Sequence, residues 1–121
     1  MTYSEFRYLW NVREVEKDNV ARLKDITNVM TVTKVSVFRA LERLEKGGYV
    51  QKNKDRKIYL TEKGRGFLKE YEQAIFSLKE KMLQFAGIEE DTAEEEAMRI
   101  VCVLSDESRG KIVQAWQKRE G

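Results

Sequence analysis

Two short segments of the chain are rich in side chains of the types that bind phosphate. The first holds Thr33, Lys34, Val35, Ser36 and Arg39, and the second holds Lys52, Lys54, Arg56 and Lys57. Lysine and arginine neutralise phosphates, and hydroxyls donate hydrogen bonds to phosphate oxygens. Arg39 can also bind a guanine edge through two hydrogen bonds, and Val35 offers an apolar surface to a thymine methyl group. The two segments together predict contact with double-stranded DNA.

The charge distribution along the chain favours the same partner. Residues 1–60 carry 13 basic and 8 acidic residues, whereas residues 61–121 carry 10 basic and 13 acidic residues. Such an asymmetry indicates a polyanion on the first half, although an unevenly charged, solvated surface is the alternative. Arg22 and Arg43 add two cations near the two segments and complete the predicted DNA-binding set.

Apolar spacing predicts the elements that position these residues. Helices are expected over residues 4–17, 23–29, 34–46 and 61–85, with two more following Gly87, and strands over 49–52 and 57–60. Ser4, Thr33 and a Thr92–Glu95 capping box are the predicted helix starts, and Gly47-Gly48 is the predicted end of the third helix. Phe38 lies off the apolar stripe of that helix, and its direction, toward DNA or toward the first helix, stays open.

This order of elements predicts a mainly α (α+β) fold. A winged helix–turn–helix DNA-binding domain is expected over residues 1–63 and a helical dimerisation domain over residues 64–121. The apolar stripe of the long helix runs from Phe67 to Phe85, farther than a small winged helix can cover. A second subunit is therefore expected to cover it, which makes the protein a homodimer.

The composition argues against several other classes of protein. The chain has no histidine, a single cysteine, Cys102, and no glycine-rich phosphate loop or nucleophile motif, so neither an enzyme nor a cofactor is expected. The first residues lack the layout of a signal peptide, and no apolar run approaches membrane-spanning length. A cytoplasmic protein without a membrane partner is expected.

Residues 20–64 resemble the winged-helix domain of many bacterial repressors, including the multiple-antibiotic-resistance regulators. Residues 87–105, GIEEDTAEEEAMRIVCVLS, resemble the dimerisation signature of the diphtheria-toxin-repressor and manganese-transport-regulator family, in its short form without an SH3-like domain. The resemblance implies a homodimer that regulates metal-homeostasis genes, as a repressor or an activator, when Mn²⁺ or Fe²⁺ binds. A repressor is the expected form.

The chain departs from this family at the metal ligands. Aligned by eye, the ligand positions fall on Phe6, Leu9, Ile75, Met98, Val101 and Cys102. Hard divalent ions prefer oxygen ligands and imidazole, so the Mn/Fe site is expected to be lost and replaced by one dry cluster. The sulfur atoms of Met98 and Cys102 could instead bind a soft metal or react with an oxidant, so a sensor of either kind is an alternative. A winged-helix module that binds protein instead of DNA is the other alternative.

Overall fold

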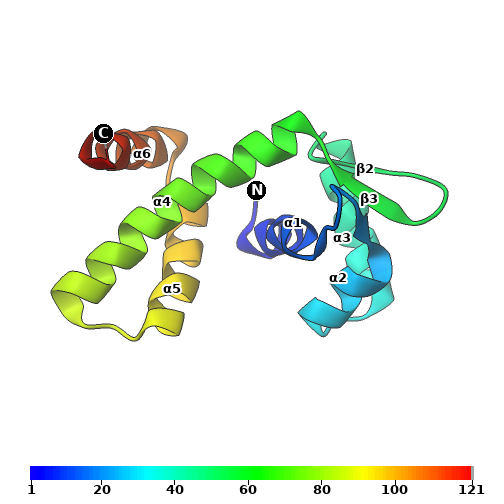
Figure 1. Cartoon of the computed structure of the whole chain (residues 1–121), viewed down its shortest axis with the longest axis horizontal. Coiled ribbons are helices and arrows are strands. Elements are labelled where there is room, and N and C mark those ends of the chain that lie inside the picture. The colour runs from blue at the N-terminus through cyan, green and yellow to red at the C-terminus, as the bar shows by residue number, and fades with distance from the viewer. Residues whose placement is uncertain (121) are drawn as a thin grey trace. The chain divides into compact units, whose positions relative to one another are not determined.

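The structure, a computed structural model, describes residues 1–120 (Figure 1). The chain forms two compact units. The N-terminal unit is Ser4–Leu68, and the C-terminal unit combines Met1–Tyr3 with the chain from Lys69 onwards. A winged helix–turn–helix with a small antiparallel sheet is followed by further helices, so the predicted mainly helical fold class is confirmed.

The N-terminal unit contains the helices and strands of the winged helix. They are α1 (Tyr3–Val15), β1 (Ala21–Arg22), α2 (Leu23–Met30), α3 (Lys34–Lys46), β2 (Val50–Lys52), β3 (Lys57–Leu60) and the first turns of α4 (Glu62–Ala86). The strands pair antiparallel in the order β1-β3-β2, with Ala21 opposite Ile58 and Val50 opposite Leu60. Strand β1 was not predicted, because two residues are too few to show an alternating pattern.

A tight turn brings β1 to the sheet. Lys17 and Val20 exchange two backbone hydrogen bonds of 2.8 and 3.1 Å, and the residues between them, Asp18 and Asn19, have φ values of 53° and 66°. Two consecutive left-handed residues are typical of the type I′ hairpin turn, which Asn and Asp tolerate well. The turn places Arg22 opposite Lys57, beside the wing.

The core of the N-terminal unit follows the predicted stripes. Val37, Ala40, Leu41 and Leu44 of α3 are buried, as are Ile26 of α2 and Ile58 of β3. Aromatic contacts extend this core: the ring of Phe67 lies 6.5 Å from that of Phe6 and 5.1 Å from that of Tyr49.

The start of α4 is fastened to the loop that ends α3. The hydroxyl of Thr61 accepts the Gly64 N–H at 3.0 Å and donates to the Gly48 carbonyl at 2.6 Å. Gly64 is required here, because a Cβ added to it would lie 2.2 Å from the Tyr49 carbonyl oxygen. Arg65 adds a two-point ion pair with Glu16, at 2.9 and 3.0 Å, between the start of α4 and the end of α1.

Of the predicted helix caps, only the one on α3 is confirmed. Thr33 accepts the Ser36 N–H at 3.1 Å, and α3 ends at Lys46, before the glycine pair. The other two predictions are wrong. Helix α1 already begins at Tyr3, so Ser4 lies inside it. Helix α5 (Glu90–Val103) is preceded by Glu89, which makes no side-chain cap, and Thr92 lies inside the helix.

The C-terminal unit consists of the rest of α4, α5 and α6 (Asp106–Glu120). Its buried apolar residues are Tyr71, Ala74, Ile75, Ala93, Ala97 and Val101. Arg109 is also buried: its guanidinium lies 4.2 Å from the centre of the Tyr71 ring and donates to the Leu104 carbonyl and to Asp106.

Burial decreases along α4. Tyr71, Ala74 and Ile75 are buried, Leu78 and Met82 are half-buried, and Phe85 is 80% exposed. The predicted apolar stripe is thus only partly covered. Within residues 1–120, no helix is both long and apolar enough to span a bilayer.

Candidate nucleic-acid interface

Helix α3 presents the first predicted set of DNA-binding residues. Its buried face holds the helix against the core, and its first turn is fixed by the Thr33 cap. The opposite face is consequently turned outward. Thr33, Lys34, Val35, Ser36, Arg39 and Arg43 are all exposed.

The wing presents the second set, and hydrogen bonds to one side chain hold its turn. The side-chain oxygen of Asn53 accepts the N–H groups of Asp55, at 2.9 Å, and Lys57, at 3.1 Å. Arg56 has a φ of 61°, a left-handed conformation that arginine rarely adopts. Lys54 and Arg56 are exposed at the tip, and Lys57 is half-buried at the start of β3.

Most of these cations form no ion pair within the part of the chain that the structure describes. Among residues 1–120, no carboxylate forms an ion pair with Arg22, Lys34, Arg39, Arg43, Lys54, Arg56 or Lys57. Their charges are therefore available to an external polyanion.

Lys52 differs from the other predicted contacts. Its backbone N–H donates to Glu45 at 2.9 Å, its Nζ lies 4.0 Å from the same carboxylate, and only 19% of its side chain is exposed. The Nζ also lies 4.3 Å from the centre of the Phe38 ring. Phe38 and Glu45 thus hold Lys52 between the wing and α3, an arrangement that the sequence did not predict.

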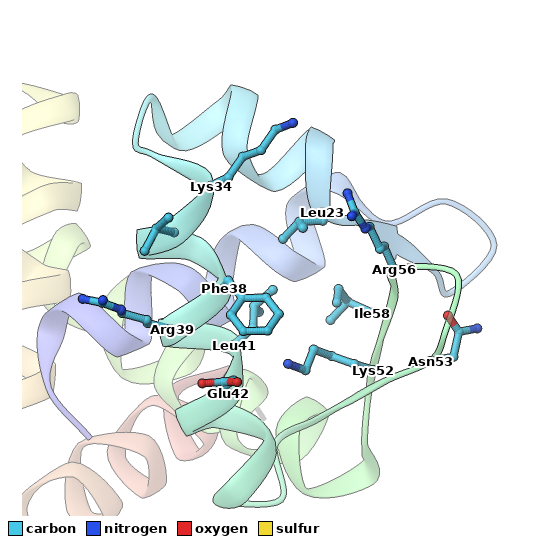
Figure 2. Close-up of a pocket in the computed structure, with 11 residues that line it drawn as sticks. Leu23, Lys34, Phe38, Arg39, Leu41, Glu42, Lys52, Asn53, Arg56 and Ile58 are labelled. Carbon is cyan, nitrogen blue, oxygen red and sulfur yellow. The ribbon is translucent and has the colours of Figure 1, made fainter.

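A pocket of about 510 Å³ separates α3 from the wing (Figure 2). Phe38, Leu41 and Ile58 supply apolar surface to it, and Lys52 reaches in from β2. Phe38 is 48% exposed and lines this pocket, which answers the question of its direction. The guanidinium of Arg39 points away from the wing.

The six positions expected to have lost a metal site lie in both units. Phe6 and Leu9 belong to the N-terminal unit, and Ile75, Met98, Val101 and Cys102 to the C-terminal unit. Four of them, Phe6, Leu9, Ile75 and Val101, are fully buried apolar side chains, which do not fit Mn²⁺ or Fe²⁺. Their packing as one cluster stays a prediction.

Cys102 lies in a setting that favours the thiol. Burial is the main cause that raises its pKa to about 11, and the N-terminal amino group and Arg109 only partly oppose this shift. The thiolate, which is the reactive and metal-binding form, is therefore disfavoured at neutral pH. In residues 1–120, no group of three or more His, Cys, Asp and Glu side chains has the arrangement of a metal site.

The geometry of residues 4–68 agrees with a comparison of the sequence with protein families. Residues 1–57 match the MarR family. The N-terminal part of the chain is thus a MarR-like winged helix, and families of this kind are transcription regulators that typically have no enzymatic activity. No curated protein shows significant similarity to the chain.

Solved structures extend the likeness to nearly the whole chain. The hypothetical protein SSo2273 from Sulfolobus solfataricus is 22% identical with a TM-score of 0.76, over 98% of this chain and 91% of that one. IdeR from T. acidophilum is 23% identical with a TM-score of 0.68, over 97% of this chain but only 53% of its own. BpsR from Bordetella bronchiseptica is 20% identical with a TM-score of 0.50, over 99% of this chain and 75% of its own.

At these identities the structures show a shared fold. It is the fold of winged-helix DNA-binding transcriptional regulators, IdeR and BpsR among them. The chain spans about half the length of IdeR. The similarity in fold to IdeR is in line with the family resemblance noted for residues 87–105.

Proposed function

We propose that the protein is a sequence-specific DNA-binding transcriptional regulator that acts as a homodimer, most simply as a repressor. The observation that carries this proposal is the outward face of α3, whose cations, together with those of the wing other than Lys52, have no carboxylate partner among residues 1–120. Helix α3 enters the major groove, and the wing lies along the neighbouring backbone.

Each exposed residue of α3 has a part in this proposal. Arg39 binds a guanine edge, and Val35 contacts a thymine methyl group. Thr33, Lys34, Ser36 and Arg43 contact phosphates, as do Arg22, Lys54, Arg56 and Lys57 around the wing. Lys52 instead positions the wing, because Glu45 and Phe38 already hold its charge.

The second subunit is proposed to cover the apolar surface of the C-terminal unit. Phe76, Phe85, Ile100 and Val103 of this unit are between 39% and 81% exposed. Soluble monomers rarely keep a contiguous apolar patch of large side chains in water. A dimer also brings two α3 helices to two half-sites about 34 Å apart, or a multiple of that distance.

A salt titration of duplex-DNA binding tests the proposal. If each subunit neutralises about three phosphates, the slope of log K against log salt is about −5 for a dimer. Sedimentation of the same samples measures the stoichiometry. Weak binding that is independent of salt would instead support a module that binds protein.

We further propose that this regulator has lost the Mn²⁺ or Fe²⁺ gate of the metalloregulators that it resembles. The fully buried apolar side chains at four of the six ligand positions, Phe6, Leu9, Ile75 and Val101, support this reading. A resident metal at 100 times its dissociation constant would stabilise the fold by about 2.7 kcal/mol. A saturating rise in melting temperature with Mn²⁺, reversed by a chelator, would contradict the proposal.

The alternative gate is a soft metal or an oxidant acting through Cys102 and Met98. These residues lie one turn apart on α5, and both are half-buried. The raised pKa of Cys102 weighs against this alternative. The test is to add Cu(I) or peroxide to the parent and to Cys102→Ser. If either reagent changes DNA binding in the parent but not in the variant, this alternative gate replaces the ungated form.

A further inference from the structure

A second, smaller pocket of about 230 Å³ lies where β1, α2, α3 and the wing meet. Its charged lining consists of Arg22, Lys24, Lys34, Asp55, Arg56 and Lys57. Five cations therefore surround one small space in the presence of a single carboxylate. Lys24 was not among the DNA-binding residues expected from the sequence.

None of these five cations is neutralised within the described part of the chain. In residues 1–120 the side chains of these five residues form neither an ion pair nor a hydrogen bond: Arg22, Lys24, Lys34, Arg56 and Lys57. Like charges gathered in this way repel each other, and the repulsion is relieved when an anion binds between them.

The backbone of Arg56 points to the same ligand independently. Its left-handed conformation, with a φ of 61°, is one that glycine or asparagine adopts at lower cost. The conformation turns the Arg56 carbonyl toward the Leu23 N–H, at 3.4 Å, and the side chain to the start of α2 (Figure 2). Strained residues cluster at ligand clamps, active sites and switch regions, where the surrounding structure holds them in place.

We propose that this pocket, named here the α2 phosphate pocket, binds a single phosphate of the DNA backbone beside the groove that α3 occupies. The inference rests on the proposed function and adds Lys24 and the start of α2 to its contact surface. The ligand chemistry is that of a phosphate oxyanion, with DNA as its source and not a free phosphate compound.

Two variants test the pocket, each against the same control. Lys24→Ala and Arg56→Gly each remove one cation from it, whereas Lys46→Ala removes an exposed cation at the opposite end of α3. Fluorescence anisotropy with a mixed-sequence duplex, repeated over a series of NaCl concentrations, gives affinity and salt slope. Each pocket variant loses one phosphate contact in both subunits of the dimer, so it is expected to bind roughly sixtyfold more weakly at about 0.1 M salt and to make the slope shallower by about 2. Lys46→Ala is expected to match the parent.

Thermal melting separates a binding role of Arg56 from a structural one. Arg56→Gly removes the strained backbone, so its melting temperature is expected to stay the same or rise by roughly 2–5 °C while DNA binding weakens. A melting temperature that falls together with the affinity would assign Arg56 a structural role and overturn the inference at this residue.

The remaining outcomes distinguish the pocket from the proposed function. If the parent shows no salt-dependent binding to duplex DNA, the proposed function fails. If the parent binds and both pocket variants keep its slope, only the pocket assignment fails. The last experiment measures the melting temperature of the protein without DNA, in inorganic phosphate and in NaCl of equal ionic strength. A saturable stabilisation that Lys24→Ala abolishes would assign the pocket to free phosphate and overturn its assignment to DNA.

Discussion

The two units of the molecule use their charged side chains in opposite ways. In the C-terminal unit most cations are paired: Lys79 with Glu90 and Glu94, Arg99 with Glu95, Lys111 with Glu107, Arg119 with Glu80, and Arg109 with Asp106. In the N-terminal unit the cations of α3 and the wing tip are unpaired among residues 1–120. The C-terminal unit thus neutralises most of its own cations, whereas the surface of α3 and the wing tip stays positively charged.

Apolar surface follows a related division. The two most exposed large apolar side chains, Phe85 and Val103, at 80% and 81%, both belong to the C-terminal unit. The exposed Val35 and Phe38 of the N-terminal unit lie instead among cations on α3, where a groove of DNA can cover them. The difference suggests two kinds of partner, a polyanion for one unit and a second apolar surface for the other.

The largest effect is expected at Gly64, where the start of α4 lies against the Tyr49 backbone of the N-terminal unit. In Gly64→Ala the new Cβ would overlap the Tyr49 carbonyl oxygen, so α4 must move away from the wing. We expect a loss of about 4 kcal/mol or more in the free energy of unfolding, measured by urea denaturation. Gly66→Ala is the matched control: nothing lies within 4 Å of its Cβ, and alanine favours helix by about 0.5–1 kcal/mol. Equal stability of the two variants would refute this account of the junction.

The second effect concerns the apolar surface of the C-terminal unit. Phe85→Ser removes a side chain whose burial is worth about 2 kcal/mol per copy, so a symmetric dimer would weaken roughly a thousandfold. Sedimentation equilibrium measures the change, with Gln114→Ser as an exposed, polar control on α6. An unchanged monomer–dimer equilibrium would remove Phe85 from the interface and weaken the comparison between the units.

The third effect separates base reading from phosphate binding within the N-terminal unit. Arg39→Ala is expected to cost about 1–3 kcal/mol of binding and to relax the preference at one base pair per half-site. Lys54→Ala is expected to weaken all sequences about equally. Binding to a library of duplexes measures both. If the two variants lose the same affinity for every sequence, Arg39 is a phosphate contact and not a base contact.

The features that the sequence predicted are local ones. The stripe of α3, its Thr33 cap and the glycine pair at its end each depend on residues within a turn or two. Strand β1 exists only through its pairing with β3, and the pairing of Lys52 with Glu45 joins the wing to α3, so neither leaves a local pattern. The Ser4 and Thr92 caps failed because each helix could also begin a residue or more earlier.

A smaller effect is expected at Lys52, the one predicted contact whose charge is already used. Lys52→Met keeps the aliphatic stem but loses the ion pair and the cation–π contact, together worth about 1 kcal/mol. We expect DNA binding to weaken by roughly fivefold with an unchanged salt slope, and Lys52→Arg to restore it. Lys54→Met should instead make the slope shallower by about 2, because one phosphate contact is lost in each subunit of the dimer. The same reduction in Lys52→Met would make Lys52 a phosphate contact after all.

The smallest effect is expected at Cys102, where the C-terminal unit holds a neutral group. At neutral pH Cys102→Ser should bind DNA like the parent, since the thiol is protonated in both the folded and the unfolded protein. The unfolded thiol has a pKa of about 8.5 and the folded one a pKa of about 11. Between these values the native state binds more protons, so the parent should lose stability relative to Cys102→Ser as the pH rises. Below about pH 8 the difference between the two should be constant. Chemical denaturation of both proteins from pH 6 to 10.5 measures it. A difference that already changes between pH 6 and 8 would indicate a thiolate at neutral pH, and with it a C-terminal unit able to respond to oxidants.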